Sequence, residues 1–354
     1  MKRLIVVLLL ISVVFSLGFA QGQKEAVAGK KGWRIALSND YAGNSWRQTM
    51  IKDFEKVGKI AMDKGLIAEA KVFTTNESSA AEQAAQIQNL ILEGYDAIVL
   101  NAASPTALNG AVRQALDAGV VVVSFDNTIT EPQAWRLITD FLYAGAAQVE
   151  FIADRFSKAN LLEIRGLSGT YVNDAIHEGI TGALKNYPGL KVVGEVYGDW
   201  TQSVSQREVA GILPSLGKID AVVTQGGDGY GAAKAFEAAG RKLPLIIMGN
   251  RYDELVLWKE LDQKLGGYDT MSISIPPGAV TIAFWTALEV LNGNDVPKEM
   301  TLRPLTITKD SLDYHIGNTE KGGVATLVYP QAWVQELIAN LKAGNPPPVD
   351  PISK

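Results

Sequence analysis

Residues 95–127 read YDAIVLNAASPTALNGAVRQALDAGVVVVSFDN, and this stretch decides the fold class. Two apolar runs, Ala97–Asn101 and Val120–Phe125, flank a segment whose apolar residues recur with helical spacing. Gly119 stands where that helix should stop. A short apolar strand, a helix and a second apolar strand predict one strand–helix–strand unit of a parallel sheet covered on both faces.

The same alternation of short apolar runs and longer helical stretches extends over most of the chain. The further apolar runs are Ile35–Ser38, Ala70–Phe73, Leu161–Ile164, Val192–Tyr197, Ala221–Thr224 and Leu245–Met248. Capping-box patterns mark helix starts at Ser45, Ser79 and Ser203, each followed three residues later by Gln or Glu. The sequence therefore predicts an α/β protein with doubly wound parallel sheets and right-handed crossovers.

The strand–helix series restarts near Asp140, which predicts two lobes rather than one. A single core rarely serves more than roughly 250–300 residues, so the length of the chain also favours two domains. We expect the chain to cross between the lobes near Asp140, Ser274 and Arg303. The predicted parts are a signal peptide over 1–20, a flexible linker over 21–32, an N-terminal lobe over 33–140 plus 275–303, a C-terminal lobe over 141–274 plus 304–340, and a tail over 341–354.

The N-terminus has the three parts of a secretion signal. Lys2 and Arg3 form a basic start, the stretch from Leu4 to Leu17 is almost wholly apolar, and Gly18-Phe19-Ala20 offers small residues for a signal peptidase. The apolar run is shorter than the roughly 20 residues that a membrane span needs. We therefore expect cleavage near Ala20 and export to the periplasm, with an uncleaved anchor as the alternative.

The composition excludes several kinds of chemistry. The chain has no cysteine and only two histidines, His177 and His315. The lack of cysteine excludes disulfides, a thiol nucleophile, zinc–thiolate sites and a lipid anchor on a cysteine after the signal. A formal net charge of −5 without a basic cluster argues against nucleic-acid binding, which depends on neutralising phosphates. Two histidines are too few for a His-rich metal centre, and we expect neither a cofactor nor a metal.

The loops that follow the predicted strands share one kind of chemistry. In open α/β sheets, ligands bind beyond the carboxyl ends of the strands, and here those ends carry carboxylates, amides and aromatic rings. The loops begin at Asn39, Asp126, Gly166, Asp199, Gln225 and Gly249. Amides and carboxylates bond vicinal hydroxyls in pairs, and such polar groups would be costly to bury without a partner. The mixture indicates a polyhydroxylated ligand.

Five markers, in order, give the chain a family resemblance. They are Gly43-Asn44-Ser45-Trp46, Tyr95 to Asn101 followed by Ser-Pro, Val123-Ser124-Phe125-Asp126-Asn127, Thr139-Asp140, and Gly166 to Gly179. Over residues 33–305 the chain resembles the periplasmic sugar-binding proteins of ABC importers, of the ribose-binding-protein type. The resemblance implies the type I periplasmic binding protein fold, in which a three-crossing hinge joins two Rossmann-like lobes and sugar binds between them.

The resemblance also implies which residues bind the ligand. Asp126 matches an aspartate that accepts sugar hydroxyls, while Trp46 and Trp200 match aromatic residues that face the sugar from opposite lobes. The full set of predicted ligand-binding residues is Asn44, Trp46, Arg47, Asp126, Asn127, Asn173, Asp174, Trp200, Gln225, Asp228, Asn250 and Ser274.

Several of these positions depart from the ribose-binding pattern. Asn127 stands where ribose binders usually have arginine, and Arg47 stands where a second aromatic residue is common. Asn250 replaces a usual aspartate, Ser274 replaces a hinge glutamine, and the usual Asn-Asp pair near Gln225 is missing. These departures indicate a sugar other than ribose, or a polyol.

The predicted function is therefore that of a monomeric receptor, not an enzyme, that captures a monosaccharide or polyol. The resemblance implies delivery to the membrane permease and ATPase subunits of an ABC importer. One alternative is a receptor for a non-sugar ligand such as a signalling furanone, a nucleoside or a sugar acid. Others are the effector domain of a sugar-responsive repressor and an exported α/β enzyme. A dinucleotide-binding enzyme has formal support in Gly227-x-Gly229-x-x-Ala232, which follows a predicted strand.

Overall fold

The structure is a computed structural model that describes residues 32–76 and 78–351. The predicted signal peptide over 1–20 and residues 21–31 of the predicted linker lie outside the described residues. None of the described helices combines the length and the apolar character that a membrane crossing requires.

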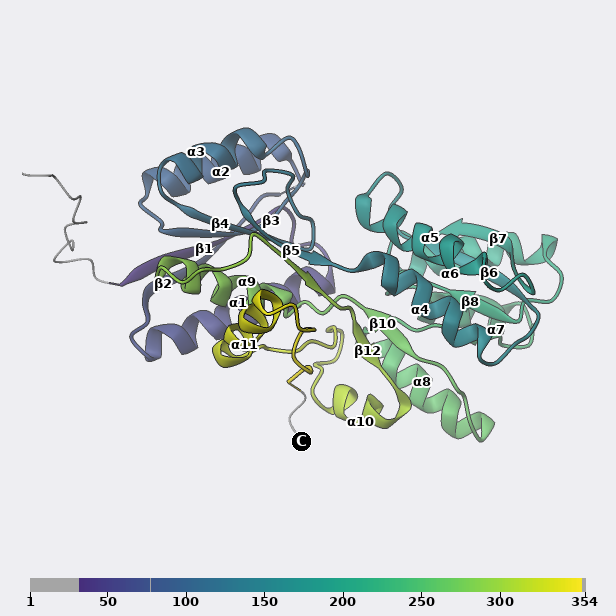
Figure 1. Ribbon diagram of the computed structural model, residues 1–354. Coiled ribbons are helices and arrows are strands. Elements are labelled where there is room, and N and C mark those ends of the chain that lie inside the picture. Colours follow the sequence, from purple (N-terminus) through teal and green to yellow (C-terminus); the bar gives the residue numbers. More distant parts are fainter. Residues whose placement is uncertain (1–31, 77, 352–354) are drawn as a thin grey trace, which may run out of the picture. The chain divides into compact units, whose positions relative to one another are not determined.

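The first sheet is parallel and doubly wound (Figure 1). Its strands, in the order β11-β5-β4-β3-β1-β2, are β1 (Trp33–Asn39), β2 (Ile67–Thr74), β3 (Ala97–Asn101), β4 (Val121–Phe125), β5 (Trp135–Thr139) and β11 (Glu299–Leu302). Its helices are α1 (Ser45–Asp63), α2 (Ala80–Leu92), α3 (Asn109–Asp117) and α9 (Ala279–Leu291). Alternate strand residues enter two cores: Leu37 and Val99 pack with α1 and α9, whereas Ile98 and Val122 pack with α2 and α3. Because both faces are covered, the central strands β3 and β4 are buried along their whole length and mostly apolar, and the predicted fold class is confirmed.

The second sheet repeats this plan with four parallel strands. In the order β7-β6-β8-β9 they are β6 (Ala159–Arg165), β7 (Leu190–Tyr197), β8 (Ala221–Val223) and β9 (Leu245–Ile246). The accompanying helices are α4 (Phe141–Ala153), α5 (Tyr171–Leu184), α6 (Gln202–Ile212), α7 (Gly229–Ala238) and α8 (Tyr252–Leu265), with a short 3-10 turn at Leu213–Ser215. Leu161 packs with α4 and α5, whereas Leu162 packs with α6 and α7, so this sheet is also covered on both faces.

Three segments connect the two sheets. The chain leaves the first sheet after β5 to enter α4, returns after β10 (Ser272–Ser274) to enter α9, and leaves again between β11 and β12 (Leu305–Ile307). Strands β10 and β12 pair antiparallel as a two-stranded sheet. These connections fall at the three positions expected near Asp140, Ser274 and Arg303. The exact lobe boundaries drawn from the sequence stay predictions.

The predicted helix starts are right in one case and displaced in two. Ser79 caps α2, as expected. The prediction of Ser45 as a cap is wrong, because the preceding residue, Asn44, accepts the backbone N–H of the first turn instead. The prediction of Ser203 is also wrong, because α6 begins after Thr201 and contains Ser203 within it.

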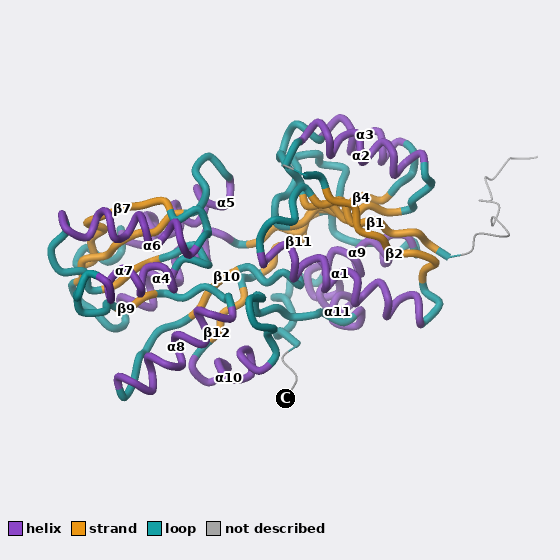
Figure 2. Tube along the Cα trace, turned by 180° about the vertical axis from the view of Figure 1, so that it is seen from behind, coloured by secondary structure: helices purple, strands orange, loops and turns teal. Residues whose placement is uncertain are grey.

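The C-terminal segment covers helix α9. This helix is apolar all round, and its residues Ala279–Glu289 are all buried, which one sheet face alone cannot achieve. Helix α11 (Gln331–Lys342) packs on α9 (Figure 2). The Trp285 indole N–H donates to the Tyr329 carbonyl at 3.0 Å. The short helix α10 (Lys309–Gly317) packs on α8. The segment after residue 310 thus completes the burial of α9.

The tight packing of α4 on α5 gives a first testable prediction. A Cβ at Gly179 would meet the Leu142 backbone, whereas a Cβ at Gly182 in the same helix would meet nothing within 4 Å. Gly179→Ala should therefore lower the free energy of unfolding by about 1–3 kcal/mol, as overpacking does. The matched variant Gly182→Ala should be neutral or stabilise by up to about 1 kcal/mol, since Ala favours a helix. Equal effects of the two substitutions in urea unfolding would contradict this packing.

A second prediction concerns Asp53 of α1, which is buried and accepts a 2.6 Å hydrogen bond from Thr326 Oγ1. Burial raises the pKa of Asp53 to about 6, against the hydrogen bond from Thr326 and the charge of Lys56. Because the folded-state pKa is the higher one, the folded state holds the proton more tightly. The associated stability is fully present below about pH 4 and is lost as the pH rises through 6.

Asp53→Asn keeps the hydrogen-bond acceptor and removes this titration. Relative to Asp53→Asn, the wild type should lose about 2–3 kcal/mol of stability between pH 4 and pH 7. Glu55→Gln, an exposed change in the same helix, serves as the control and should show no such divergence. If the free energies of unfolding of the wild type and Asp53→Asn change with pH in the same way over this range, the burial argument is wrong.

Candidate functional site

A buried polar cluster lies at the carboxyl edge of the first sheet. Strands β1, β3 and β4 are neighbours there, and Asn39 and Asn101 are register partners at the ends of β1 and β3. We call Asn39, Asp40, Arg47, Asn101 and Asp126 the first cluster. The side chains of Asn39 and Asn101 are fully buried, and Asp40 is 4% exposed. Polar groups held in this way need partners, and the cluster supplies several of them, although the buried Asn101 Oδ1 has no hydrogen-bond partner among the described residues.

Arg47 binds the first cluster together. Arg47 lies in the first turn of α1, where the Asn44 side chain accepts a hydrogen bond of 2.8 Å from the Arg47 backbone N–H. The guanidinium lies 3.1 Å from Asp40 Oδ1 and donates to Asn39 Oδ1 at 3.3 Å. Arg47 is only 7% exposed, so this is a buried ion pair rather than a surface one.

Asp126 places a carboxylate beside this ion pair. It accepts a 3.3 Å hydrogen bond from Asn101 Nδ2, and its φ of 57° lies in the left-handed region that non-glycine residues rarely adopt. Burial raises the pKa of Asp126, while the positive charge of Arg47 and the Asn101 hydrogen bond oppose the rise. Asp126 is half-buried, and a strained backbone together with a carboxylate of raised pKa are features that gather at functional sites.

Two other predicted residues of this region have structural contacts. The Trp46 indole N–H donates to the Ile275 carbonyl at 2.9 Å, which ties the start of α1 to the second connecting segment. Arg47 lies over the Trp46 ring at 5.3 Å. The Asn127 carbonyl accepts the Ala102 N–H at 3.1 Å, which joins the loops after β3 and β4.

A second polar group gathers at the carboxyl edge of the other sheet. Gln225 accepts the Gly166 N–H at 3.0 Å and donates to the Asn173 carbonyl at 2.9 Å. Arg165, the last residue of β6, donates to Asn173 Oδ1 at 3.3 Å and to Asp174 Oδ1 at 3.2 Å. We call Arg165, Asn173, Asp174 and Gln225 the second cluster. Three of its four members were predicted to bind ligand.

Asp228, the residue before α7, and Glu254, in the first turn of α8, form a buried acidic pair at the start of α7. Glu254 Oε1 accepts the backbone N–H of Gly229 at 2.7 Å and that of Gly249 at 3.1 Å. Burial raises the pKa of Glu254, and burial together with repulsion by Glu254 raises the pKa of Asp228 well above its usual range. Carboxylates already occupy the helix start that a dinucleotide phosphate would need. The Gly227-x-Gly229-x-x-Ala232 pattern therefore does not form an anion site here.

Trp200, Asn250 and Ser274 complete the predicted set. The Trp200 indole lies against Gly166, and the Trp200 carbonyl accepts from Arg251 Nη2 at 2.6 Å. Asn250 is buried and donates to the Ala325 carbonyl at 3.0 Å. Ser274 is the half-buried last residue of β10. The ligand-binding role of all these residues stays a prediction.

The structure adds residues that the sequence reasoning did not select. They are Asn39, Asp40, Asn101, Arg165, Arg251 and Glu254. Asn39, Asn101 and Arg165 are each the last residue of a strand. A polar residue that ends a buried strand is therefore a signal in the sequence for the carboxyl edge of the sheet.

Two doubly wound sheets, three connecting segments and a polar cluster at the carboxyl edge of each sheet define the class of two-lobed solute-binding proteins. A family model described as "Periplasmic binding protein domain" matches residues 35–295, so the chain belongs to that family.

The relatives agree with this assignment. The chain is 27% identical over 252 residues to a xylitol-binding protein of Mycolicibacterium smegmatis, covering 69% of this chain and 70% of the relative. It is 26% identical over 310 residues to a ribose import binding protein of Bacillus subtilis, covering 85% and 97%. An ABC transporter solute-binding protein from Thermobispora bispora has 36% identity and a TM-score of 0.80, covering 91% of this chain and 99% of that one.

The buried ion pair gives a third prediction. Arg47→Met should destabilise the protein by about 3 kcal/mol or more, because it leaves Asp40 buried without its cation. The double variant Asp40→Asn/Arg47→Met should cost less than the sum of the two single variants, since the unpaired charge is absent. The exposed Arg207→Met should cost no more than about 1 kcal/mol. Strict additivity in this double-mutant cycle would show that the two side chains do not interact.

Proposed function

We propose that the protein is a receptor that binds a neutral monosaccharide or polyol between its two polar clusters. The observation that carries the proposal is Asp126, a carboxylate beside the Arg47–Asp40 ion pair at the carboxyl edge of the first sheet. A carboxylate can accept hydrogen bonds from two neighbouring hydroxyls, and buried charge-assisted bonds are the strong ones. The names of the xylitol-binding and ribose import relatives support this ligand class.

The charges of the two clusters favour a neutral ligand over a sugar acid. Arg47 is already paired with Asp40 in the first cluster, and Arg165 is paired with Asp174 in the second. The Arg251 guanidinium bonds a carbonyl and faces the acidic pair Asp228 and Glu254. An added ligand carboxylate would therefore meet uncompensated negative charge rather than a free cation.

The remaining parts of the proposal follow from the family. We propose that the protein works as an exported monomer, freed of its signal peptide near Ala20, and delivers its ligand to the permease and ATPase of an ABC importer. Contacts from both clusters to one ligand would favour the closed arrangement of the two lobes, since a ligand shifts an equilibrium by its differential affinity. Binding and release need no catalytic acid or base.

A thermal-shift screen tests the ligand class. Pentoses, hexoses, hexitols and pentitols should include at least one compound that raises Tm in a dose-dependent way, as binding to the folded state requires. Sugar acids of the same skeleton should give smaller shifts. Stabilisation by nucleosides alone, or by none of the carbohydrates, would contradict the proposal.

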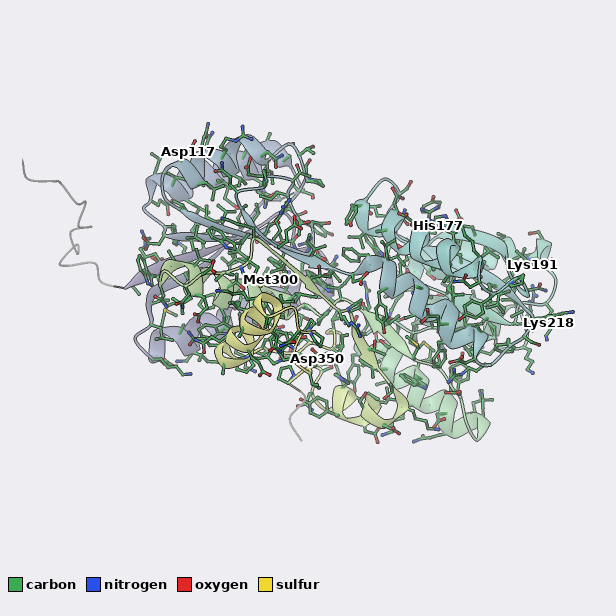
Figure 3. The ribbon with its side chains drawn as sticks, viewed as in Figure 1. Asp117, His177, Lys191, Lys218, Met300 and Asp350 are labelled. Carbon is green, nitrogen blue, oxygen red and sulfur yellow. The ribbon has the colours of Figure 1, made fainter. Side chains whose placement is uncertain are left out.

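Replacing Asp126 gives the fourth prediction. Asp126→Ala should weaken binding of the best compound from the screen at least about 100-fold, because two charge-assisted bonds are lost. The matched control is Asp117→Ala, an exposed carboxylate labelled in Figure 3 that ends α3 just before β4 begins, and so lies at the amino edge of the first sheet. Calorimetric titration at pH 7 measures both. Unchanged affinity of a folded Asp126→Ala protein would remove the first cluster from the binding site.

A further inference from the structure

A further group of titratable side chains lies beneath helix α5 and adjoins the second cluster through Arg165. Glu163 of β6 and Glu195 of β7 are register partners, so their side chains lie on the same face of the second sheet. His177, which is labelled in Figure 3, belongs to α5, and its Nδ1 lies close to Glu163. One ligand atom from each of Glu163, His177 and Glu195 lies within 4.8 Å of the others.

Glu163 has a buried oxygen without a partner. Its side chain is 1% exposed, and Oε1 lies 2.8 Å from His177 Nδ1. Oε2 is buried and has no hydrogen-bond partner among the described residues. Burial raises the pKa of the Glu163 carboxyl, and the interaction with His177 opposes this rise. An unpartnered buried carboxylate oxygen is costly, so a group that binds it would be stabilising.

The local charge count leaves room for a dication. Arg165 is a nearby cation that two carboxylates share, since it lies 3.2 Å from Asp174 and 3.4 Å from Glu195. One arginine therefore faces the carboxylates of Asp174, Glu195 and Glu163, which leaves two excess negative charges when all three are ionised. A neutral imidazole adds a nitrogen donor without adding charge.

We propose that Glu163, His177 and Glu195 form a binding site for a divalent transition-metal ion of the Zn²⁺ class. One imidazole nitrogen and two carboxylates are a ligand set that Zn²⁺ accepts, with water in the fourth position. The count of two histidines excludes a His-rich centre, but this site needs only one.

The site can reach metal-binding distances by small movements. Ligand atoms sit about 2.0–2.2 Å from Zn²⁺, so they must lie closer together than 4.8 Å. Glu195 is the residue that moves: its side chain is 39% exposed, and β7 is the edge strand of the sheet. His177 is 30% exposed on its side chain, which provides a path for the ion from solvent.

A bound ion would tie the start of α5 to β6 and β7. Asn173 and Asp174, which precede His177 in the same helix, belong to the second cluster. The metal would therefore hold that cluster in place while remaining separate from the ligand. The proposal does not depend on the identity of the ligand, and it holds or fails without the proposed receptor function.

The experiment uses the chelator-treated protein from residue 21 to the C-terminus, which lacks only the predicted signal peptide. ZnCl₂ is titrated by calorimetry, and the imidazole signals of the two histidines are followed by NMR. We expect one strong site per chain and a large change in the His177 signals, with those of His315 unchanged. His177→Gln and Glu163→Gln should each weaken binding at least about ten-fold. Glu178→Gln, an exposed carboxylate next to His177, is the control and should bind as the wild type does.

Three results would overturn the proposal. They are the absence of Zn²⁺ binding up to about 1 mM, binding that leaves the His177 signals unchanged, and equal affinities of the wild type and a folded His177→Gln variant. The first two need only the wild-type protein, so failure of a variant to fold does not protect the proposal.

Discussion

The first cluster depends on one interaction, the buried ion pair between Arg47 and Asp40. A guanidinium that is 7% exposed is stable only if its charge and its donors are matched, and Asp40 and Asn39 provide both. The pair in turn fixes the surroundings of Asp126, whose ionised form is opposed by burial and favoured by Arg47. The ionised form of the carboxylate proposed to bind the ligand is therefore favoured by a residue whose own charge is already paired with Asp40. This arrangement also explains why the site should prefer hydroxyls to a ligand carboxylate.

The fold places these groups where they are by a simple rule of parallel sheets. Each apolar strand ends at the same edge, and the first polar residue after the apolar run falls at that edge. Asn39, Asn101 and Asp126 meet because β1, β3 and β4 are neighbours, although the residues are far apart in sequence. On the second sheet, Arg165 and Gln225 lie at one edge for the same reason, and both bond to Asn173. The C-terminal segment serves a different purpose, since it covers the apolar far side of α9.

Much of the strand pattern could be predicted because burial on both faces leaves a local signal in the sequence. Ala97–Asn101 was predicted with the bounds that β3 has in the structure. The pairing of Arg47 with Asp40 could not be predicted, because either residue could equally have faced solvent. The role of Asn44 as the cap of α1 was also not predicted, since the resemblance implied only a ligand contact for this residue. The packing of a further element on α9 could have been predicted, because Ala279–Leu291 is largely apolar on all sides and a helix of that kind must be enclosed.

The central claim is that one ligand contacts both polar clusters. Amide hydrogen exchange, compared between the free protein and the protein saturated with the best compound from the carbohydrate screen, tests this claim most directly. The account predicts slower exchange in the loops after both Asn101 and Arg165, one from each sheet. Slower exchange confined to the loops of a single sheet would contradict it.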